Sequence, residues 1–537
     1  MAADLIIHNA RIFTGAEPIV GAIAIEGGRI QMVGGLTEVR RTASNRTESI
    51  DAGGGLLTPG FIDAHVHPIS GGLKILNCSL QDAADLGEAI DMISAYATMH
   101  PEREWIWGGG WAMAWFERGL PSATALDRVV SDRPVFLYNR DGHAAWLNTK
   151  ALDLAGITAG TRDPFDGRIE RLGDGSPQGT LHEGAMGIAE AILPQPSAID
   201  LERALLAGQS YLLALGITGW QDADVQPPQD TAYLTIAQRG ELVASVVGAL
   251  WWDRYRGLEQ VEELVGRRTL MGPRYRQTSV KLMLDGVAEN FTAAMLEPYG
   301  DGTGNSTENS GIDFIDPGEL VEIVTVLDRL GFQCHFHAIG DRAVRNALDA
   351  VESARKANGD FGLMHHIAHI QFVHDDDIKR FKRLRVAANA QAYWACHEPQ
   401  MDELTLPFLS PAQAGRLYPF GRLLRSGAQM VMGSDWYVST PNPMLQAEVA
   451  VTRRSPGEGD ADPLLPDDAM TLADAVAGFT IGSATINRVD DRVGSIEPGK
   501  DADLVIFDRD PFKDPPIGEA KVVATIVRGK VVYESDS

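Results

Sequence analysis

Short apolar and polar runs alternate near both ends of the chain. Apolar stretches such as residues 22–25 end at glycine turns. Residues 502–507 form a similar short apolar run close to the C-terminus. Alternation punctuated by glycine is typical of antiparallel strands. We therefore predict a small β-sandwich domain built from both termini, residues 1–57 together with residues 484–537.

Between these ends, apolar runs rich in β-branched residues alternate with stretches of helical periodicity. This order indicates a parallel sheet covered by helices, and eight strand–helix units close into a barrel. The eight expected strands are residues 57–66, 216–222, 243–251, 279–284, 332–337, 365–372, 385–393 and 429–433. We therefore predict an α/β fold in which residues 58–483 form a (β/α)8 barrel of the TIM type.

One connection in this barrel is far longer than the others. Residues from about 70 to 205 separate the first expected strand from the second, and residues 134–138 look like a strand of their own. Long additions to such barrels collect at the mouth, where they shape substrate pockets. We expect this segment to be an insertion over the barrel mouth.

The charge balance narrows the classes of partner. The chain has 47 Lys and Arg against 73 Asp and Glu, a formal net charge of −26. Such a surface repels phosphate backbones and anionic lipids, so we expect a small-molecule substrate and neither nucleic acid nor a membrane.

Cysteine usage and hydropathy bear on the compartment. Cys78, Cys334 and Cys396 are the three cysteines, with no Cys-x-x-Cys spacing, and no apolar run approaches the length of a membrane span. The N-terminus does not read as an export signal. We expect a cytoplasmic protein without a disulfide scaffold or a thiolate zinc site.

The strongest chemical signal lies at the end of the first barrel strand. Residues 61–67 read Phe-Ile-Asp-Ala-His-Val-His, which places His65 and His67 one residue apart. Side chains alternate along a strand, so both imidazoles project to the same side. Imidazole is a standard ligand of zinc and similar ions. The alternative is a pair of hydrogen-bonded core histidines.

Four further polar residues stand at or near the ends of later strands. They are Lys281, His337, His369 and Asp435. His335 shares strand parity with His337, and His365 shares it with His369, so each pair can face the barrel axis although only one member need bind metal. Taken singly, each histidine could be structural, and Asp435 could instead cap a helix.

Lys281 is unusual because it sits inside an apolar strand. Burial disfavours the ammonium form, and a neutral amine can react with carbon dioxide to give an anionic carbamate able to bridge two metal ions. The alternative is a lysine that reaches solvent or pairs with Asp285.

Taken in order, these motifs resemble the amidohydrolase superfamily, and within it the branch that includes N-substituted formamide deformylase. The matching stretches are residues 58–67, 141–148, 280–286, 337–343, 369–371 and 433–436. The resemblance implies a metal shell of His65, His67, Lys281, His337, His369 and Asp435. It also implies two divalent ions, with zinc favoured, and an N6-carboxylated Lys281 that bridges them.

The insertion supplies candidate substrate contacts. His143, Asn148 and Glu183 belong to stretches that resemble this branch, and Trp111 and Trp115 follow a run of three glycines. The two indoles could form an aromatic wall of the pocket, although packing in a core is the alternative for them.

The predicted function is hydrolysis of an amide-type C–N bond in an N-acyl, N-formyl or related substrate, with Asp435 as the catalytic proton acceptor. One alternative is a hydrolase of another bond on the same site, such as a cyclic imide, an ester or a deaminated carbon. Another is a catalytically weak binding or regulatory protein on the same barrel. A homodimer is the expected assembly.

Overall fold

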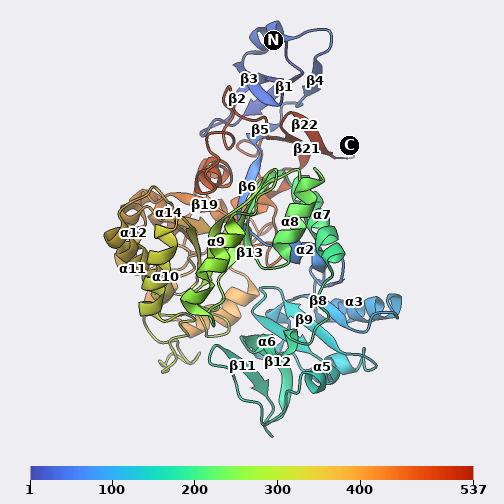
Figure 1. The fold of residues 1–537 in the computed structure, drawn as a ribbon, viewed down its shortest axis with the longest axis vertical. Helices are drawn as coiled ribbons and strands as arrows, with labels where there is room; N and C mark the ends of the chain where they lie inside the picture. Colours follow the sequence, from blue (N-terminus) through green and yellow to red (C-terminus); the bar gives the residue numbers. More distant parts are fainter. Residues whose placement is uncertain (1, 536–537) are drawn as a thin grey trace.

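Three sheets organise the molecule. The computed structural model describes residues 2–535. A sheet of strands from both termini lies at one end of the central barrel, and the insertion lies at the opposite end (Figure 1).

The sheet at the termini is continuous in its strand pairing, in the order β22-β21-β20-β5-β1-β2-β3 with β4 beside β1. Its strands are β1 (Leu5–Ile12), β2 (Ile19–Glu26), β3 (Arg29–Gly34), β4 (Glu48–Asp51), β5 (Leu56–Pro59), β20 (Leu504–Phe507), β21 (Val522–Val527) and β22 (Lys530–Glu534). The antiparallel pairing of β5 with β20 joins the two ends of the chain. Short helix α1 (Leu36–Val39) packs against this sheet.

The barrel contains all eight expected strands, and they are parallel. In order around the sheet they are β6 (Phe61–Val66), β13 (Ile217–Val225), β14 (Ser245–Trp251), β15 (Tyr275–Met283), β16 (Gln333–Ala338), β17 (His366–His369), β18 (Ala387–Ala390) and β19 (Met430–Met432). The predicted α/β barrel fold is therefore confirmed, and the strand ends need local correction.

The first expected strand is in fact two strands. β5 belongs to the terminal sheet and β6 to the barrel, with Gly60 between them. A Cβ at Gly60 would lie 2.2 Å from the Thr218 hydroxyl oxygen, so the chain changes sheets where a side chain cannot fit. β17 ends earlier than expected because His369 and Ile370 adopt left-handed φ angles of 76° and 44°.

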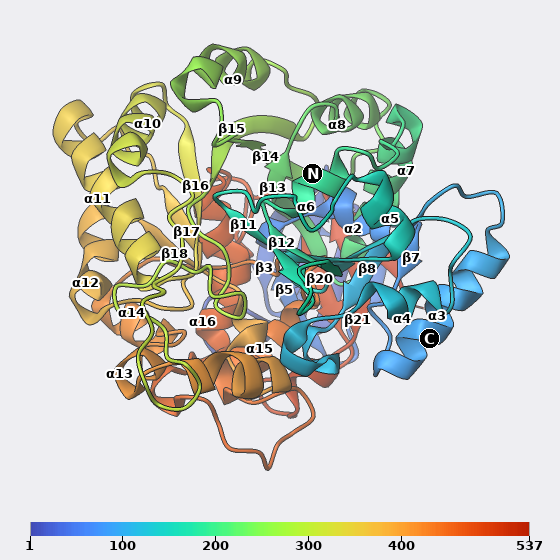
Figure 2. The same cartoon turned by 90° about the horizontal axis from the view of Figure 1, so that it is seen from below.

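Helices surround the barrel, as Figure 2 shows from the mouth. They are α2 (Pro68–Ile75), α7 (Ala198–Ala214), α8 (Gln229–Gln238), α9 (Val261–Arg268), α10 (Pro317–Arg329), α11 (Asp341–Asn358), α12 (Asp375–Leu384), α13 (Pro411–Ala414), α14 (Phe420–Ser426), α15 (Pro443–Thr452), α16 (Leu472–Ala477) and α17 (Ser483–Ile486). Their apolar faces and the outer face of the barrel form the largest hydrophobic core. None of the helices that the structure describes is both long and apolar enough to cross a bilayer.

The insertion forms a sheet of its own in the order β11-β12-β10-β9-β8-β7. Its elements are β7 (Cys78–Ser79), α3 (Leu86–Met99), β8 (Ile106–Trp111), α4 (Ala123–Asp127), β9 (Val135–Asn139), β10 (Ala144–Leu147), α5 (Thr149–Leu154), β11 (Gly167–Arg171), β12 (Pro177–Glu183) and α6 (Met186–Glu190). Seen from below, it lies in front of the barrel mouth (Figure 2). The mouth is therefore covered by a folded layer with its own small cores.

The packing of α2 against α7 gives a test of the fold. A Cβ at Gly72 would lie 1.9 Å from the backbone oxygen of Ala204, whereas one at Gly266 in α9 would have nothing within 4 Å. Gly72→Ala should lower the free energy of unfolding by about 1–3 kcal/mol because α2 must move away from α7. Gly266→Ala is the matched control and should be neutral or stabilise by up to about 1 kcal/mol. Chemical unfolding midpoints measure both, and equal midpoints would contradict this packing.

Candidate active site

The barrel brings the six predicted metal ligands to one place. They lie at the carboxyl ends of β6, β15, β16, β17 and β19, or directly after them, and all line a single cavity of about 840 Å³. These residues are His65, His67, Lys281, His337, His369 and Asp435. Because parallel strands end on the same side of the barrel, ligands distant in sequence meet there.

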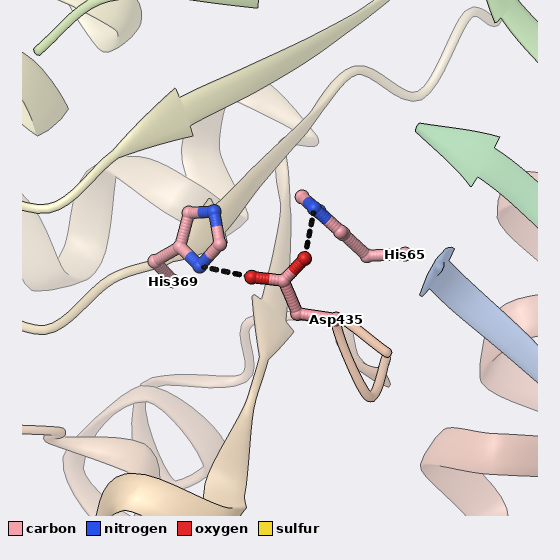
Figure 3. Close-up of side chains that lie close together, drawn as sticks. All are labelled: His65, His369 and Asp435. Carbon is pink, nitrogen blue, oxygen red and sulfur yellow. Dashed lines mark ion pairs between the residues drawn. The ribbon is translucent and has the colours of Figure 1, made fainter. Parts of the chain in front are cut away.

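Asp435 lies between His65 and His369 (Figure 3). Its Oδ1 lies 3.2 Å from Nε2 of His65 and 3.0 Å from Nε2 of His67, and its Oδ2 lies 3.9 Å from Nδ1 of His369. Ligand atoms of His65, His369 and Asp435 all lie within 4.8 Å of one another, and the three residues are buried. Three strand ends thus point their polar atoms at one small volume.

The residues present fit a divalent metal ion. Oδ1 of Asp435 and Nδ1 of His369 are buried and make no well-directed hydrogen bond to any described residue. A buried polar atom without a partner is costly, and an ion would satisfy both atoms at once. Imidazole and carboxylate are the donors that zinc and related ions take. Metal binding at these residues remains our prediction.

The protonation states also favour metal binding. Burial lowers the pKa of His65 to about 3 and the pKa values of His337 and His369 well below the ordinary range of histidine. Burial by itself would raise the pKa of Asp435, but the neighbouring His65 and His67 outweigh it and hold that pKa well below its usual value. Neutral imidazoles and an ionised carboxylate are the forms that bind metals.

Lys281 is 2% exposed, and its Nζ lies 3.4 Å from Nε2 of His65. Burial lowers its pKa to about 8, so a share of the amine is uncharged at neutral pH. Asp285 is not its partner, because Asp285 accepts the backbone N–H groups of Ala294, Ile339 and Gly340. The alternative of a Lys281–Asp285 pair is therefore wrong.

Two further histidines, His335 and His366, lie inside the barrel beside the predicted ligands. His335 Nε2 lies 2.9 Å from Nδ1 of His65, a hydrogen bond that leaves Nε2 of His65 free for a metal. His365 does not face the barrel axis, contrary to the parity expectation, since its Nε2 lies 3.1 Å from Asp328. His366 lies inside instead, against His335, because the left-handed φ of His369 interrupts the alternation of β17.

Two polar side chains that the sequence analysis missed fix the ligand-bearing backbone. Asp63 Oδ1 accepts the N–H groups of both His65 and Ser434, so it ties the end of β6 to the loop after β19. Gln391 Oε1 accepts the N–H of His369. The detectable signal for Asp63 was a carboxylate two residues before a ligand in an otherwise apolar strand.

Two of the predicted substrate contacts reach the cavity from the insertion. His143 and Glu183 both line it, with Nδ1 of His143 2.8 Å from Oε2 of Glu183. Thr292 donates its hydroxyl to the other oxygen of Glu183 at 2.8 Å. Burial alone would lower the pKa of His143, but the Glu183 carboxylate outweighs it and raises that pKa to about 9.

The other three predicted contacts lie elsewhere. Asn148 caps α5, accepting N–H groups from Val135 and Ala151 and donating to two backbone carbonyls. Trp111 and Trp115 pack in a core of the insertion, where Trp111 Nε1 donates to the carbonyl of Leu137. None of these three lines the cavity. Their expected role as substrate contacts is corrected to a structural one.

Several lining residues gave no signal in the sequence. They include Lys74, Trp107, Asp224, Arg254 and Tyr437, whereas Asp141 belongs to the stretch 141–148 that resembles the family. Their positions depend on how the insertion folds over the mouth, which no local motif reveals.

The family was established by comparison with known proteins. The model of the amidohydrolase family matches residues 48–533. The chain belongs to the amidohydrolase family. This membership supports a metal-dependent hydrolase on a barrel of this type.

Full-length relatives of this amidohydrolase occur in distant organisms. It is 30% identical to Protein LONG AFTER FAR-RED 3 of Arabidopsis thaliana, covering 99% of this chain and 92% of that protein. It is 28% identical to N-substituted formamide deformylase of Arthrobacter pascens, covering 99% and 98%. A crystal structure of an uncharacterized metal-dependent hydrolase from Pyrococcus furiosus superposes with a TM-score of 0.72 and 26% identity, covering 95% and 100%.

The structural role of Asn148 in this amidohydrolase is testable. Asn148→Ala removes the cap of α5 and leaves buried backbone groups unpaired, so it should lower the free energy of unfolding by about 2 kcal/mol or more. Metal content and turnover per folded molecule should stay at the wild-type level. Asn305→Ala, in an exposed loop where Asn305 contacts Asp301, is the control and should change stability little. Loss of turnover without loss of stability would return Asn148 to the substrate pocket.

Proposed function

We propose that this protein hydrolyses an amide-type C–N bond of a small N-acyl or N-formyl substrate, using two divalent metal ions. The observation that carries the proposal is the convergence of six ligand side chains in one cavity, with buried ligand atoms of Asp435 and His369 that lack hydrogen bonds. The 28% identity to N-substituted formamide deformylase over almost the whole chain supports the choice of bond.

The proposed ligands divide into two groups around Lys281. His65, His67 and Asp435 would hold one ion, since Asp435 Oδ1 is close to both imidazoles. His337 and His369, whose ring centroids are 4.4 Å apart, would contribute to the second. The uncharged amine of Lys281 would add to carbon dioxide and lose a proton, and the resulting carbamate would bridge the pair. Zinc is favoured, although manganese, iron, cobalt and nickel accept the same donors.

When bound, the ions supply Lewis acidity toward the substrate carbonyl and toward water. Asp435, ionised and buried, accepts a proton from the attacking water and returns it to the leaving nitrogen as the C–N bond breaks. His143 lines the cavity and is held at Nδ1 by Glu183, so its Nε2 would donate to the substrate oxygen as negative charge develops there. The insertion thereby contributes a hydrogen-bond donor to the proposed reaction.

Metal content is the first prediction of this proposal. Protein purified without added metal should carry about two ions per chain, and Lys281→Ala should carry one or none because the bridging ligand is gone. Lys150→Ala, an exposed lysine whose Nζ contacts the Asp132 carbonyl, is the control and should keep both ions. Elemental analysis measures the content. Wild-type protein without metal, and without recovery of activity on adding zinc or manganese, would favour a binding protein instead.

The bond type is tested with a panel of N-formyl amines, N-acyl amines, esters and cyclic imides. We expect formate or carboxylate release from the amides, lost after chelation and restored by zinc. Hydrolysis of esters or cyclic imides alone would contradict the proposed amide bond type but would remain consistent with the proposed metal centre. Liquid chromatography of the products distinguishes these results.

The role of His143 gives a third prediction. His143→Ala should lower kcat by about 10²- to 10³-fold because a donor to the developing oxyanion is removed. Its metal content should stay at two ions, since His143 is outside the proposed ligand set. Glu183→Gln should lower kcat less, because the imidazole remains but loses its carboxylate partner. A His143→Ala enzyme with wild-type kcat would refute this role.

A further inference from the structure

One cationic side chain in the cavity has no evident partner. Lys74 belongs to α2, which directly follows the strand that carries His65 and His67. The residue is 5% exposed, and its side chain lines the same cavity as the proposed metal ligands. Its Nζ makes no hydrogen bond to any residue between 2 and 535.

Aromatic faces surround the Lys74 ammonium group in place of a carboxylate. Nζ lies 3.5 Å from the ring centroid of Tyr437 and 5.7 Å from that of Tyr138. Such faces attract a cation but do not replace an ion pair and its hydrogen bonds. Burial lowers the pKa of Lys74 well below its ordinary value, and Asp141 and Asp435 oppose this shift without forming an ion pair in the described chain. In the free protein the amine is therefore shifted toward its uncharged form, and an anion bound beside it would restore the ammonium form.

Several other charged groups of the cavity have protein partners. Arg254 pairs with Asp166, Glu183 pairs with His143, and Glu190 accepts the hydroxyl of Tyr138 at 2.9 Å. Arg254 keeps a buried Nε without a hydrogen bond, but its guanidinium is paired with Asp166. Lys74 differs because it has neither an ion pair nor a hydrogen bond within residues 2–535.

We propose that Lys74 binds a carboxylate of the substrate, so that the cavity selects N-acyl amino acids over N-acyl amines. This inference rests on the proposed amide hydrolysis. Tyr437, on which the ammonium stacks, stands two residues after Asp435, the proposed proton acceptor. A carboxylate held there would be close to the bond being broken, as it is in an α-amino acid whose nitrogen is acylated.

The acidic residues of the cavity favour a cationic substrate instead, so the test must distinguish anionic from cationic substrates. Asp141 and Asp224 also line it and would attract a cationic substrate. Asp141, however, accepts the backbone N–H of His143, and Asp224 accepts the side-chain amide of Gln226. Both carboxylates therefore already have donors, whereas Lys74 has no acceptor.

Three formamides of different charge provide the test, and the anionic and neutral ones share a phenethyl group. N-formyl-L-phenylalanine is anionic, N-formylphenethylamine is neutral, and N-formyl-1,4-diaminobutane is cationic. Wild-type kcat/KM should favour the anionic substrate over the neutral one by about 30-fold or more, chiefly through KM. Lys74→Met, which keeps the chain length and removes the charge, should bring this ratio close to one. Lys150→Met should keep the wild-type ratio.

A binding measurement separates this inference from the proposed reaction. By calorimetry, 3-phenylpropionate should bind the purified wild-type protein about 30-fold or more tightly than it binds Lys74→Met, whether or not any formamide is hydrolysed. Thermal melting of Lys74→Met checks that it is folded, and the wild-type preference alone decides the matter if it is not. Equal binding of 3-phenylpropionate by wild type and Lys74→Met, an unchanged substrate ratio, or a wild-type preference for the cationic formamide would overturn the assignment to Lys74.

Discussion

The structure depends on one constraint, the burial at the barrel mouth of polar atoms that lack directed hydrogen bonds. The carboxylate of Asp435 lies against two imidazoles without a directed hydrogen bond at Oδ1. The unfolded chain would hydrate these atoms freely, so their burial costs the folded protein free energy, and the proposed metal ions would return it. The residues at the centre also adopt unfavourable backbone conformations, with φ of 76° at His369 and 56° at Asp435. Unfavourable backbone conformations persist where surrounding groups hold them in place. Here Gln391 accepts the N–H of His369, and Asp63 accepts the N–H of Ser434, next to Asp435.

The insertion and the barrel complete one site from opposite sides. Glu183 of the insertion holds His143, accepts the hydroxyl of Thr292 from the loop after β15, and so joins both parts at the cavity wall. Asn290 donates to the carbonyl of His143 across the same boundary. The insertion is therefore attached to the barrel through polar contacts at the cavity wall. A shift of the insertion would first change the position of His143.

Much of this arrangement was predictable because it depends on local sequence. Apolar β-branched runs located the eight barrel strands, and the alternation rule placed His65 and His67 on one side of β6. The alternation rule failed at β17. The left-handed backbone at His369 interrupts the alternation there, so His366 faces the barrel interior and His365 does not. Asn148 was predicted to contact substrate but caps α5. The sequence could not separate the two roles, because an asparagine side chain suits both. Lys74 gave no signal, since its environment is made by Tyr138 and Tyr437 from distant segments.

The pairing of β5 with β20 bears on how the protein is made. β5 leads into the first barrel strand, yet one of its two neighbours in the sheet, β20, comes from near the other end of the chain. During synthesis, the edge of β5 that pairs with β20 stays unpaired until almost all of the barrel has emerged from the ribosome. Such distant pairing makes folding slow and leaves apolar strand edges open in the meantime. We expect the nascent chain to be a substrate for chaperones, and a circular permutant that begins at β20 to need them less.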